Sequence, residues 1–162
     1  MKLIRIEKTD ADRLAPLVAD FRVTLNGYRG IASQPRMEAA REELLEFLDA
    51  GFPVYAAEDG DTLAGYMVCR IEEPCLWVEH LFVREAYRRR GVATLLFEQA
   101  EALAAAMGED TVFNFVHPNN LGMIAFLRSR GYTVLNMIEI RKPYPGETLT
   151  TTIPVGDAAF DF

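Results

Sequence analysis

The residues most suited to a functional site form an arginine-rich turn, Arg84 to Arg90, that is followed by Gly91. Apolar residues at the spacing of one helix face follow from Val92 to Met107. A strand that turns through a glycine into a helix directs several backbone N–H groups at one point, with the positive end of the helix dipole behind them. The chain has a net charge of −7, which makes four arginines in one turn conspicuous. Together these features indicate a binding site for a phosphate group.

Three residues are candidates for a general base, two before this turn and one in a later part of the chain. Strand alternation predicts that Glu79 shares a face with Leu81 and Val83. A charged side chain on such an apolar face is costly unless it is paired or functional, so Glu79 is either a catalytic base or the partner of an arginine. His80, on the opposite face, is either a second candidate base or a hydrogen-bonded core residue. His117 follows a later predicted strand. It is either a third candidate base near the substrate or a residue that only ends the strand.

The elements that must position these residues alternate between strands and helices. An Asp-Gly turn at Asp59-Gly60 predicts a hairpin, and Gly108 and Gly131 are expected to end two helices. Periodicity predicts strands over 3–6, 52–58, 62–71, 76–83, 111–116 and 132–140, and helices over 14–25, 37–48, 92–107 and 121–130. The remainder, from Lys142, either adds an edge strand around 149–155 or wraps the surface.

Composition narrows the class of protein. Hydrophobic residues make up 50% of the chain and charged residues 25%, as in soluble globular proteins, and no apolar run is long enough to cross a membrane. The acidic net charge argues against nucleic acid as a partner. The polar N-terminus lacks a secretion signal, which predicts a cytoplasmic protein. Cys69 and Cys75 lack metal-ligand spacing, so we expect two reduced thiols and no metal site.

Two motifs carry a resemblance to a known family. Arg88-Arg89-Arg90-Gly91-Val92-Ala93 matches the pattern Arg/Gln-x-x-Gly-x-Gly/Ala and resembles the pyrophosphate-binding loop of the GCN5-related N-acetyltransferases (GNAT), which hold coenzyme A there. Asn120, eleven residues before Gly131-Tyr132, is similar to the family's second signature. The resemblance implies an α/β (α+β) fold in one domain, residues 1–162, with a core over 1–141 and a tail over 142–162. It also implies a mixed central sheet of six to seven strands, about four helices, and splayed fourth and fifth strands.

The resemblance also implies roles for individual residues. The thioester would lie between the strand at 80–83 and the one at 113–116, and Tyr28 and Arg29 would line the acceptor site. Many members carry a tyrosine that protonates the departing thiolate, but that position here is Leu127. Tyr132 and Tyr144 are candidates to replace it, and unassisted departure is the alternative. The residues expected to contact the cofactor are Leu81, Phe82, Val83, Arg88, Arg89, Arg90, Gly91, Val92, Ala93, Thr94, Asn120 and Phe126.

We therefore expect an acetyl-CoA-dependent N-acetyltransferase that transfers the acetyl group directly to an amine of a small molecule or protein. Two alternatives stay open: a non-catalytic acetyl-CoA-binding module, which Leu127 favours, and a structural α/β protein with a coincidental loop. Because members of the family are often dimers, the resemblance also implies a possible homodimer.

Overall fold

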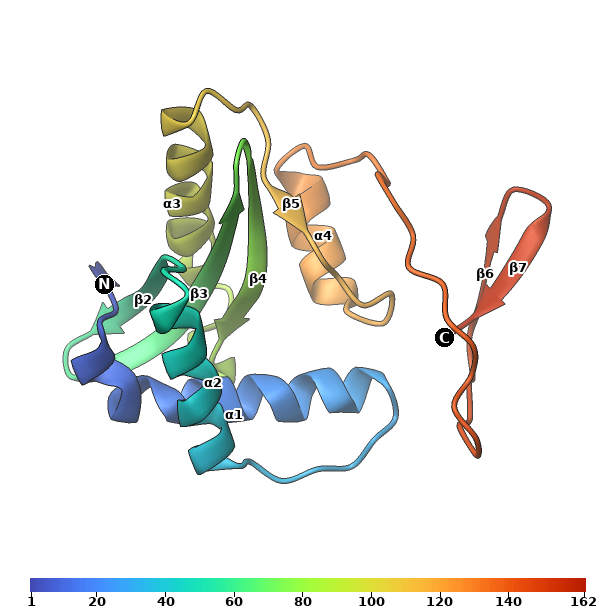
Figure 1. Cartoon of the computed structure of the whole chain (residues 1–162), viewed down its shortest axis with the longest axis horizontal. Coiled ribbons are helices and arrows are strands. Elements are labelled where there is room, and N and C mark those ends of the chain that lie inside the picture. Colours follow the sequence, from blue (N-terminus) through green and yellow to red (C-terminus); the bar gives the residue numbers. More distant parts are fainter. The chain divides into compact units, whose positions relative to one another are not determined.

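The computed structural model of the protein describes all 162 residues (Figure 1). The chain divides into two units: Met1–Thr24 with Ser33–Phe115, and Leu25–Ala32 with Val116–Phe162. The first unit contains five strands and most of the helices, and the last turn of its first helix is counted with the second unit. Its strands are β1 (Lys2–Arg5), β2 (Val54–Asp59), β3 (Thr62–Glu72), β4 (Cys75–Val83) and β5 (Phe113–Asn114). Its helices are α1 (Ala11–Tyr28), α2 (Met37–Asp49), α3 (Val92–Ala106) and two 3-10 turns, Lys8–Asp10 and Glu85–Tyr87.

The strands of the first unit form one sheet in the order β1-β2-β3-β4-β5. The first four are antiparallel neighbours, and β5 runs parallel to β4. The predicted hairpin is confirmed: β2 and β3 pair around a turn in which Gly60 has a φ of 61°. The predicted strand over 111–116 is shorter than expected, because only Phe113 and Asn114 pair with β4.

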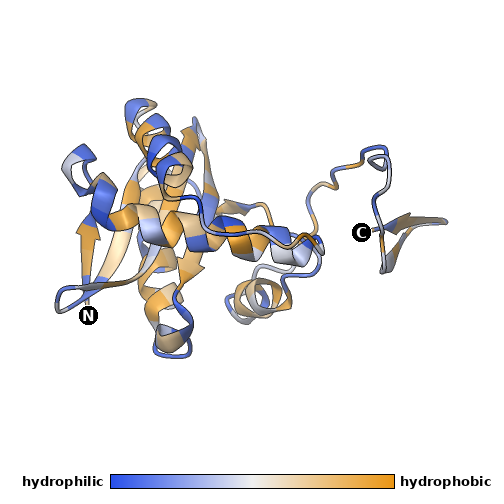
Figure 2. Ribbon diagram, turned by 90° about the horizontal axis from the view of Figure 1, so that it is seen from below, coloured by the Kyte–Doolittle hydropathy of each residue, from blue (hydrophilic) through white to orange (hydrophobic).

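Helices cover both faces of this sheet. Side chains alternate along β3, so Gly65 and Met67 face α3, while Tyr66 faces α1 and α2. Phe21 of α1 packs edge-on against the Tyr66 ring, with centroids 6.2 Å apart. Hydrophobic residues are concentrated in the strands of the sheet, as Figure 2 shows, and they form the core of this unit.

The second unit contains helix α4 (Leu121–Ser129) and a hairpin of β6 (Thr152–Val155) and β7 (Ala158–Asp161). The predicted limits of α4 are confirmed: Asn120 caps its N-terminus, accepting from the Met123 amide at 3.1 Å, and Gly131 follows its end with a φ of 90°. The residues around 149–155, for which the sequence left two alternatives, form a strand within a separate two-stranded sheet.

The strand predicted over 132–140 is wrong. Apolar residues alternate there, but a strand also needs a neighbour, and β6 pairs with β7 instead. Val134 and Leu135 are consequently 85% and 74% exposed. The central sheet therefore has five strands rather than six to seven. No helix of the chain is both long and apolar enough to cross a membrane.

Candidate functional site

The start of α3 presents free backbone amides. Gly91 is the N-cap residue, with φ 80° and ψ 3°, and neither a capping side chain nor an acidic residue occupies the first turn. The first amide of the helix with a partner in the chain is that of Leu95, which donates to the Gly91 carbonyl at 2.9 Å. The amides of Val92, Ala93 and Thr94 are therefore available, with the helix dipole behind them. This end of the helix fits a diphosphate.

The four arginines before the helix have different surroundings. Arg84 is part of the framework, because its Nε donates to the Leu63 carbonyl at 3.0 Å and its amide to the Ala64 carbonyl at 2.9 Å. Arg88, Arg89 and Arg90 are exposed beside Gly91. Arg89 has a left-handed backbone, with a φ of 62°, which costs about 1–3 kcal/mol and is typical of functional loops. Arg88 Nε also donates to the Val83 carbonyl at 3.2 Å. Three exposed cations thus directly precede Gly91 in the chain, and Arg84 holds the turn on β3.

Gly65 of β3 is a site residue that sequence reasoning missed. A Cβ atom there would lie 2.6 Å from the Phe82 carbonyl oxygen and 3.1 Å from Val92 Cγ1. The absent side chain lets the first residue of α3 lie directly against the sheet, which fixes where the free amides point. The available signal was a glycine within an otherwise apolar strand, which often marks a close approach of backbone.

The predicted splay of the fourth and fifth strands corresponds to the end of pairing between β4 and β5. The last pair is Val78 with Asn114, so no strand lies on that side of β4 from Glu79 to Val83. The side chain of Phe82 is buried, so only its backbone faces this edge. Asn114 donates from Nδ2 to the Val112 carbonyl at 2.9 Å, while its buried Oδ1 has no partner. A buried acceptor without a donor at the parting of two strands fits a ligand that supplies an N–H group.

A β-bulge changes the predicted orientation of Glu79. His80 pairs with Val68 and Val78 with Cys69, so Glu79 is the extra residue of β4 and has no partner in β3. The expectation that Glu79 shares the face of Leu81 and Val83 is wrong, because the bulge interrupts the alternation. Glu79 lies instead on the face of Arg70, whose Nε donates to Glu79 Oε1 at 2.6 Å. The free edge of β4 thus begins at a carboxylate held by an arginine.

His80 is buried in a polar network of four side chains. Its Nδ1 lies 3.0 Å from the Tyr66 hydroxyl and its Nε2 lies 3.3 Å from Glu43 Oε1, and Arg22 Nε donates to Glu43 Oε2 at 2.9 Å. Burial, reinforced by the charge of Arg22, lowers the pKa of His80 to about 3. Burial also raises the pKa of Tyr66 well above its usual value. His80 is therefore neutral at pH 7, with both ring nitrogens engaged.

Within the second unit, several predicted residues form one cluster. The Tyr28 hydroxyl donates to Asn120 Oδ1 at 3.1 Å, and the Tyr28 ring stacks on the His117 ring, with centroids 6.2 Å apart. The Asn119 amide donates to His117 Nδ1 at 3.1 Å. Burial and the charge of exposed Arg29 lower the pKa of His117, which is therefore neutral at pH 7.

The remaining predicted residues of the second unit belong to α4 and the chain after it. The guanidinium of Arg130 lies over the Phe126 ring, 5.9 Å from its centroid. Leu127 is buried, Tyr132 is half-buried and Tyr144 is exposed. The predicted site residues are thus divided: Glu79 to Thr94 in the first unit, and Tyr28, Arg29, His117, Asn120 and Phe126 in the second.

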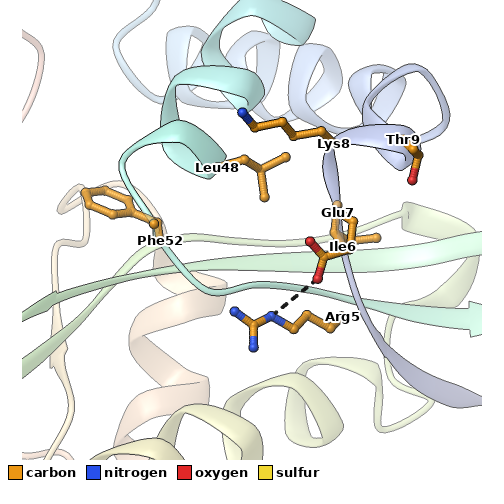
Figure 3. A pocket seen from close by; sticks show the side chains of 8 residues that line it. Arg5, Ile6, Glu7, Lys8, Thr9, Leu48 and Phe52 are labelled. Carbon is orange, nitrogen blue, oxygen red and sulfur yellow. Dashed lines mark ion pairs between the residues drawn. The ribbon is translucent and has the colours of Figure 1, made fainter.

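A pocket of about 360 Å³ lies elsewhere in the first unit (Figure 3). Arg5, Glu7, Lys8, Leu48 and Phe52 are among its lining residues, and Arg5 and Glu7 form an ion pair at 3.7 Å. Part of its wall comes from β1, at the opposite edge of the sheet from β5. It is therefore separate from the free amides of α3. No group of three His, Cys, Asp or Glu side chains is arranged to hold a metal ion.

Comparison with known proteins identifies the family. Residues 20–132, well over half of the chain, match the Acetyltransferase (GNAT) family. No curated protein sequence matches the chain. Among solved structures, an aminoglycoside antibiotic 6'-N-acetyltransferase from Acinetobacter haemolyticus is similar in fold, with a TM-score of 0.67 and 18% identity over 89% of this chain and 99% of that one.

Two further structures share the fold. A ribosomal-protein-alanine N-acetyltransferase from Brucella melitensis biovar Abortus 2308 has a TM-score of 0.69 and 16% identity over 89% of this chain and 100% of that one. AAC(6')-Iy, in complex with the bisubstrate analogue CoA-S-monomethyl-acetylneamine, has a TM-score of 0.66 and 16% identity over 88% of this chain and 97% of that one. With its fold and the uncapped start of α3, the family match shows that this chain belongs to the GNAT family of acetyltransferases.

Proposed function

We propose that the protein uses acetyl-CoA to acetylate an amine of a small molecule or a protein. The observation that carries this proposal is the start of α3, where three partnerless amides lie beside three exposed arginines. An anion with two phosphates satisfies both groups. The free edge of β4 next to it, from Glu79 to Val83, suits an extended amide-containing arm that hydrogen-bonds as a neighbouring strand would.

The chain's own residues then have two tasks. A backbone N–H at the free edge of β4 polarises the thioester carbonyl, and a base accepts the proton of the attacking amine. A primary amine with a pKa near 10.4 holds its proton at pH 7, and removing it costs about 4–5 kcal/mol. Acetyl-CoA supplies the activated acyl group, so no covalent intermediate on the protein is required.

We assign the base to Glu79, directly or through one water molecule. Glu79 lies at the bulge where the free edge of β4 begins, and about a quarter of its side chain is exposed. His80 is a weaker candidate, because Tyr66 and Glu43 engage its two nitrogens. His117 Nδ1 already accepts from the Asn119 amide. The roles of Asn120 and Phe126 toward the cofactor, and of Tyr28 and Arg29 toward the acceptor, stay predictions from the resemblance.

The departing thiolate needs no acid from Leu127. That side chain is buried hydrocarbon, and a thiol with a pKa near 8.5 leaves acceptably at neutral pH. Tyr132, which is half-buried, and Tyr144, which is exposed, stay candidates to replace that acid. The same leucine favours the second candidate function, a module that binds acetyl-CoA without turnover.

Free thiol released from acetyl-CoA, measured across a panel of amines, distinguishes the two. The panel should hold an aminoglycoside and a peptide with an N-terminal alanine, since two proteins of similar fold are an aminoglycoside and a ribosomal-protein-alanine N-acetyltransferase. A polyamine and simple aryl and alkyl amines extend the panel to other classes of amine. Transfer to any of them supports the enzyme. Thermal stabilisation by CoA without transfer to any amine supports the module, and no stabilisation by CoA contradicts both.

We also propose that the protein is a cytoplasmic homodimer. The strip Val134, Leu135, Met137, Ile138 and Ile140 is exposed and has no strand partner, and a second copy of the chain would cover it. Light scattering after size exclusion should give twice the chain mass for the wild type, and the chain mass for Leu135→Lys. A wild-type monomer at 100 µM would refute the dimer.

A further inference from the structure

Three aromatic rings lie together where β4 pairs with β5, and we call them the aromatic ledge: Trp77 of β4, Phe113 of β5, and Phe115, one residue beyond β5. The Trp77 ring lies 4.7 Å from the Phe113 ring at 31°, and 4.8 Å from the Phe115 ring at 13°. Phe115 stacks on Trp77 and is nevertheless 58% exposed. A largely exposed phenylalanine leaves an aromatic face without a protein partner.

The ledge adjoins the point where β4 and β5 separate. Trp77 pairs with Phe113, and the next pair, Val78 with Asn114, is the last. One residue further along each strand are Glu79 and Phe115, the first positions that do not pair. The ledge therefore ends level with the carboxylate that we assign as the base.

The charges around the ledge favour a cation. The Arg70 guanidinium lies 5.4 Å from the centroid of the Trp77 ring and forms ion pairs with both Glu72 and Glu79. Two carboxylates around one guanidinium leave one negative charge in excess. A ligand ammonium group beside Glu79 would compensate that charge.

We propose that the aromatic ledge is the acceptor subsite, and that the acceptor is a cationic primary amine joined through a short linker to an aromatic ring. This inference rests on the proposed acetyl transfer. The ring stacks on the free face of Phe115, and the amine reaches Glu79. Because neighbouring strands lie about 4.8 Å apart and the two strands diverge here, a linker of two carbons has a suitable length.

Trp77 is the only tryptophan of the chain, so its fluorescence reports on the ledge directly. The probes are 2-phenylethylamine and 2-cyclohexylethylamine, which match in charge and carbon count but differ in aromaticity. Each is titrated into the protein with and without saturating CoA. We expect a saturable change in Trp77 emission with the aromatic amine, at an affinity about tenfold tighter than for its cyclohexyl analogue. The ratio of kcat/KM values should have the same preference.

Phe115→Leu should remove the preference for the aromatic amine and leave CoA affinity unchanged. Phe52→Leu is the matched control, because Phe52 also stacks on another aromatic ring, that of Phe47 at 5.6 Å, but lies outside the site. Equal affinity for the two amines, or no emission change at concentrations that saturate turnover, would overturn the inference. So would emission that depends on protein concentration but not on amine, because a second copy would then cover the ledge. Failure of CoA to bind overturns the proposed function instead, and the titration without CoA still reports on the ledge.

Discussion

Exchange of Gly91 for alanine tests whether the start of α3 binds the cofactor. Gly91 has a φ of 80°, and a Cβ atom there meets no protein atom within 4 Å. Gly108, beyond the other end of the same helix, has a φ of 85° and equally open surroundings. Both substitutions should therefore cost the fold the same left-handed penalty, about 1–2 kcal/mol. Domains commonly have about 5–15 kcal/mol of stability, so both variants should remain folded at 25 °C.

The two variants should differ in CoA binding. At Gly91 the open space lies beside the free amides of Val92, Ala93 and Thr94, so a methyl group would occupy the place of the diphosphate. Loss of one hydrogen bond to a charged group costs about 1.5–3 kcal/mol, so we expect CoA to bind Gly91→Ala roughly ten- to a hundredfold more weakly than wild type. Gly108→Ala should bind as wild type does.

Calorimetry measures the affinities at 25 °C, and thermal denaturation without ligand measures the stabilities. Equal CoA affinity for Gly91→Ala and Gly108→Ala would refute the assignment of the loop. A much larger loss of stability in Gly91→Ala would show that the two positions are poorly matched, and the affinities would still decide the assignment.

Three further predictions follow from the same unit of the structure. The pKa of His80 is about 3 in the folded chain and 6.5 in the unfolded chain, so between these pH values only the unfolded chain binds the proton. The free energy of unfolding should therefore fall by about 2 kcal/mol from pH 7 to pH 5. In urea denaturation, His80→Gln should lose most of this pH dependence, and an unchanged pH dependence would exclude His80 as its source. Gly65→Ala should destabilise the fold by about 1–3 kcal/mol in the same assay, because its Cβ would lie 2.6 Å from the Phe82 carbonyl oxygen, and a neutral result would show that the sheet and α3 separate easily. Glu79→Gln should lower kcat about a hundredfold at pH 7 and leave CoA affinity unchanged. Glu72→Gln removes the other carboxylate partner of Arg70 and should leave kcat unchanged. A pH–rate profile of Glu79→Gln identical to that of the wild type would exclude Glu79 as the base.

Local signals were sufficient for the part of the fold that carries the cofactor proposal. The strand before the turn, the glycine at position 91 and the apolar stripe of α3 each depend on neighbours within a few residues. The hairpin around Gly60 and the asparagine cap of α4 depend on equally short-range chemistry, and all of them are confirmed.

Contacts between distant residues could not be read from periodicity. The bulge at Glu79 follows from the register of β3 against β4, and the side-chain alternation of an isolated strand cannot reveal it. The network around His80 joins residues as far apart in the sequence as Arg22 and His80. The segment 132–140 has the composition of a strand but lacks a neighbour to pair with, and only the folded chain decides that.

The most direct test of the central claim compares CoA with pantetheine in calorimetric titrations of the folded wild-type protein. Pantetheine keeps the arm that we place along β4 but lacks the diphosphate that we place on the amides of α3. We expect saturable binding of one CoA per chain, and binding of pantetheine at least about a hundredfold weaker, since several charge-assisted hydrogen bonds are lost. Equal affinity for the two ligands, or no binding of CoA at all, would contradict the account.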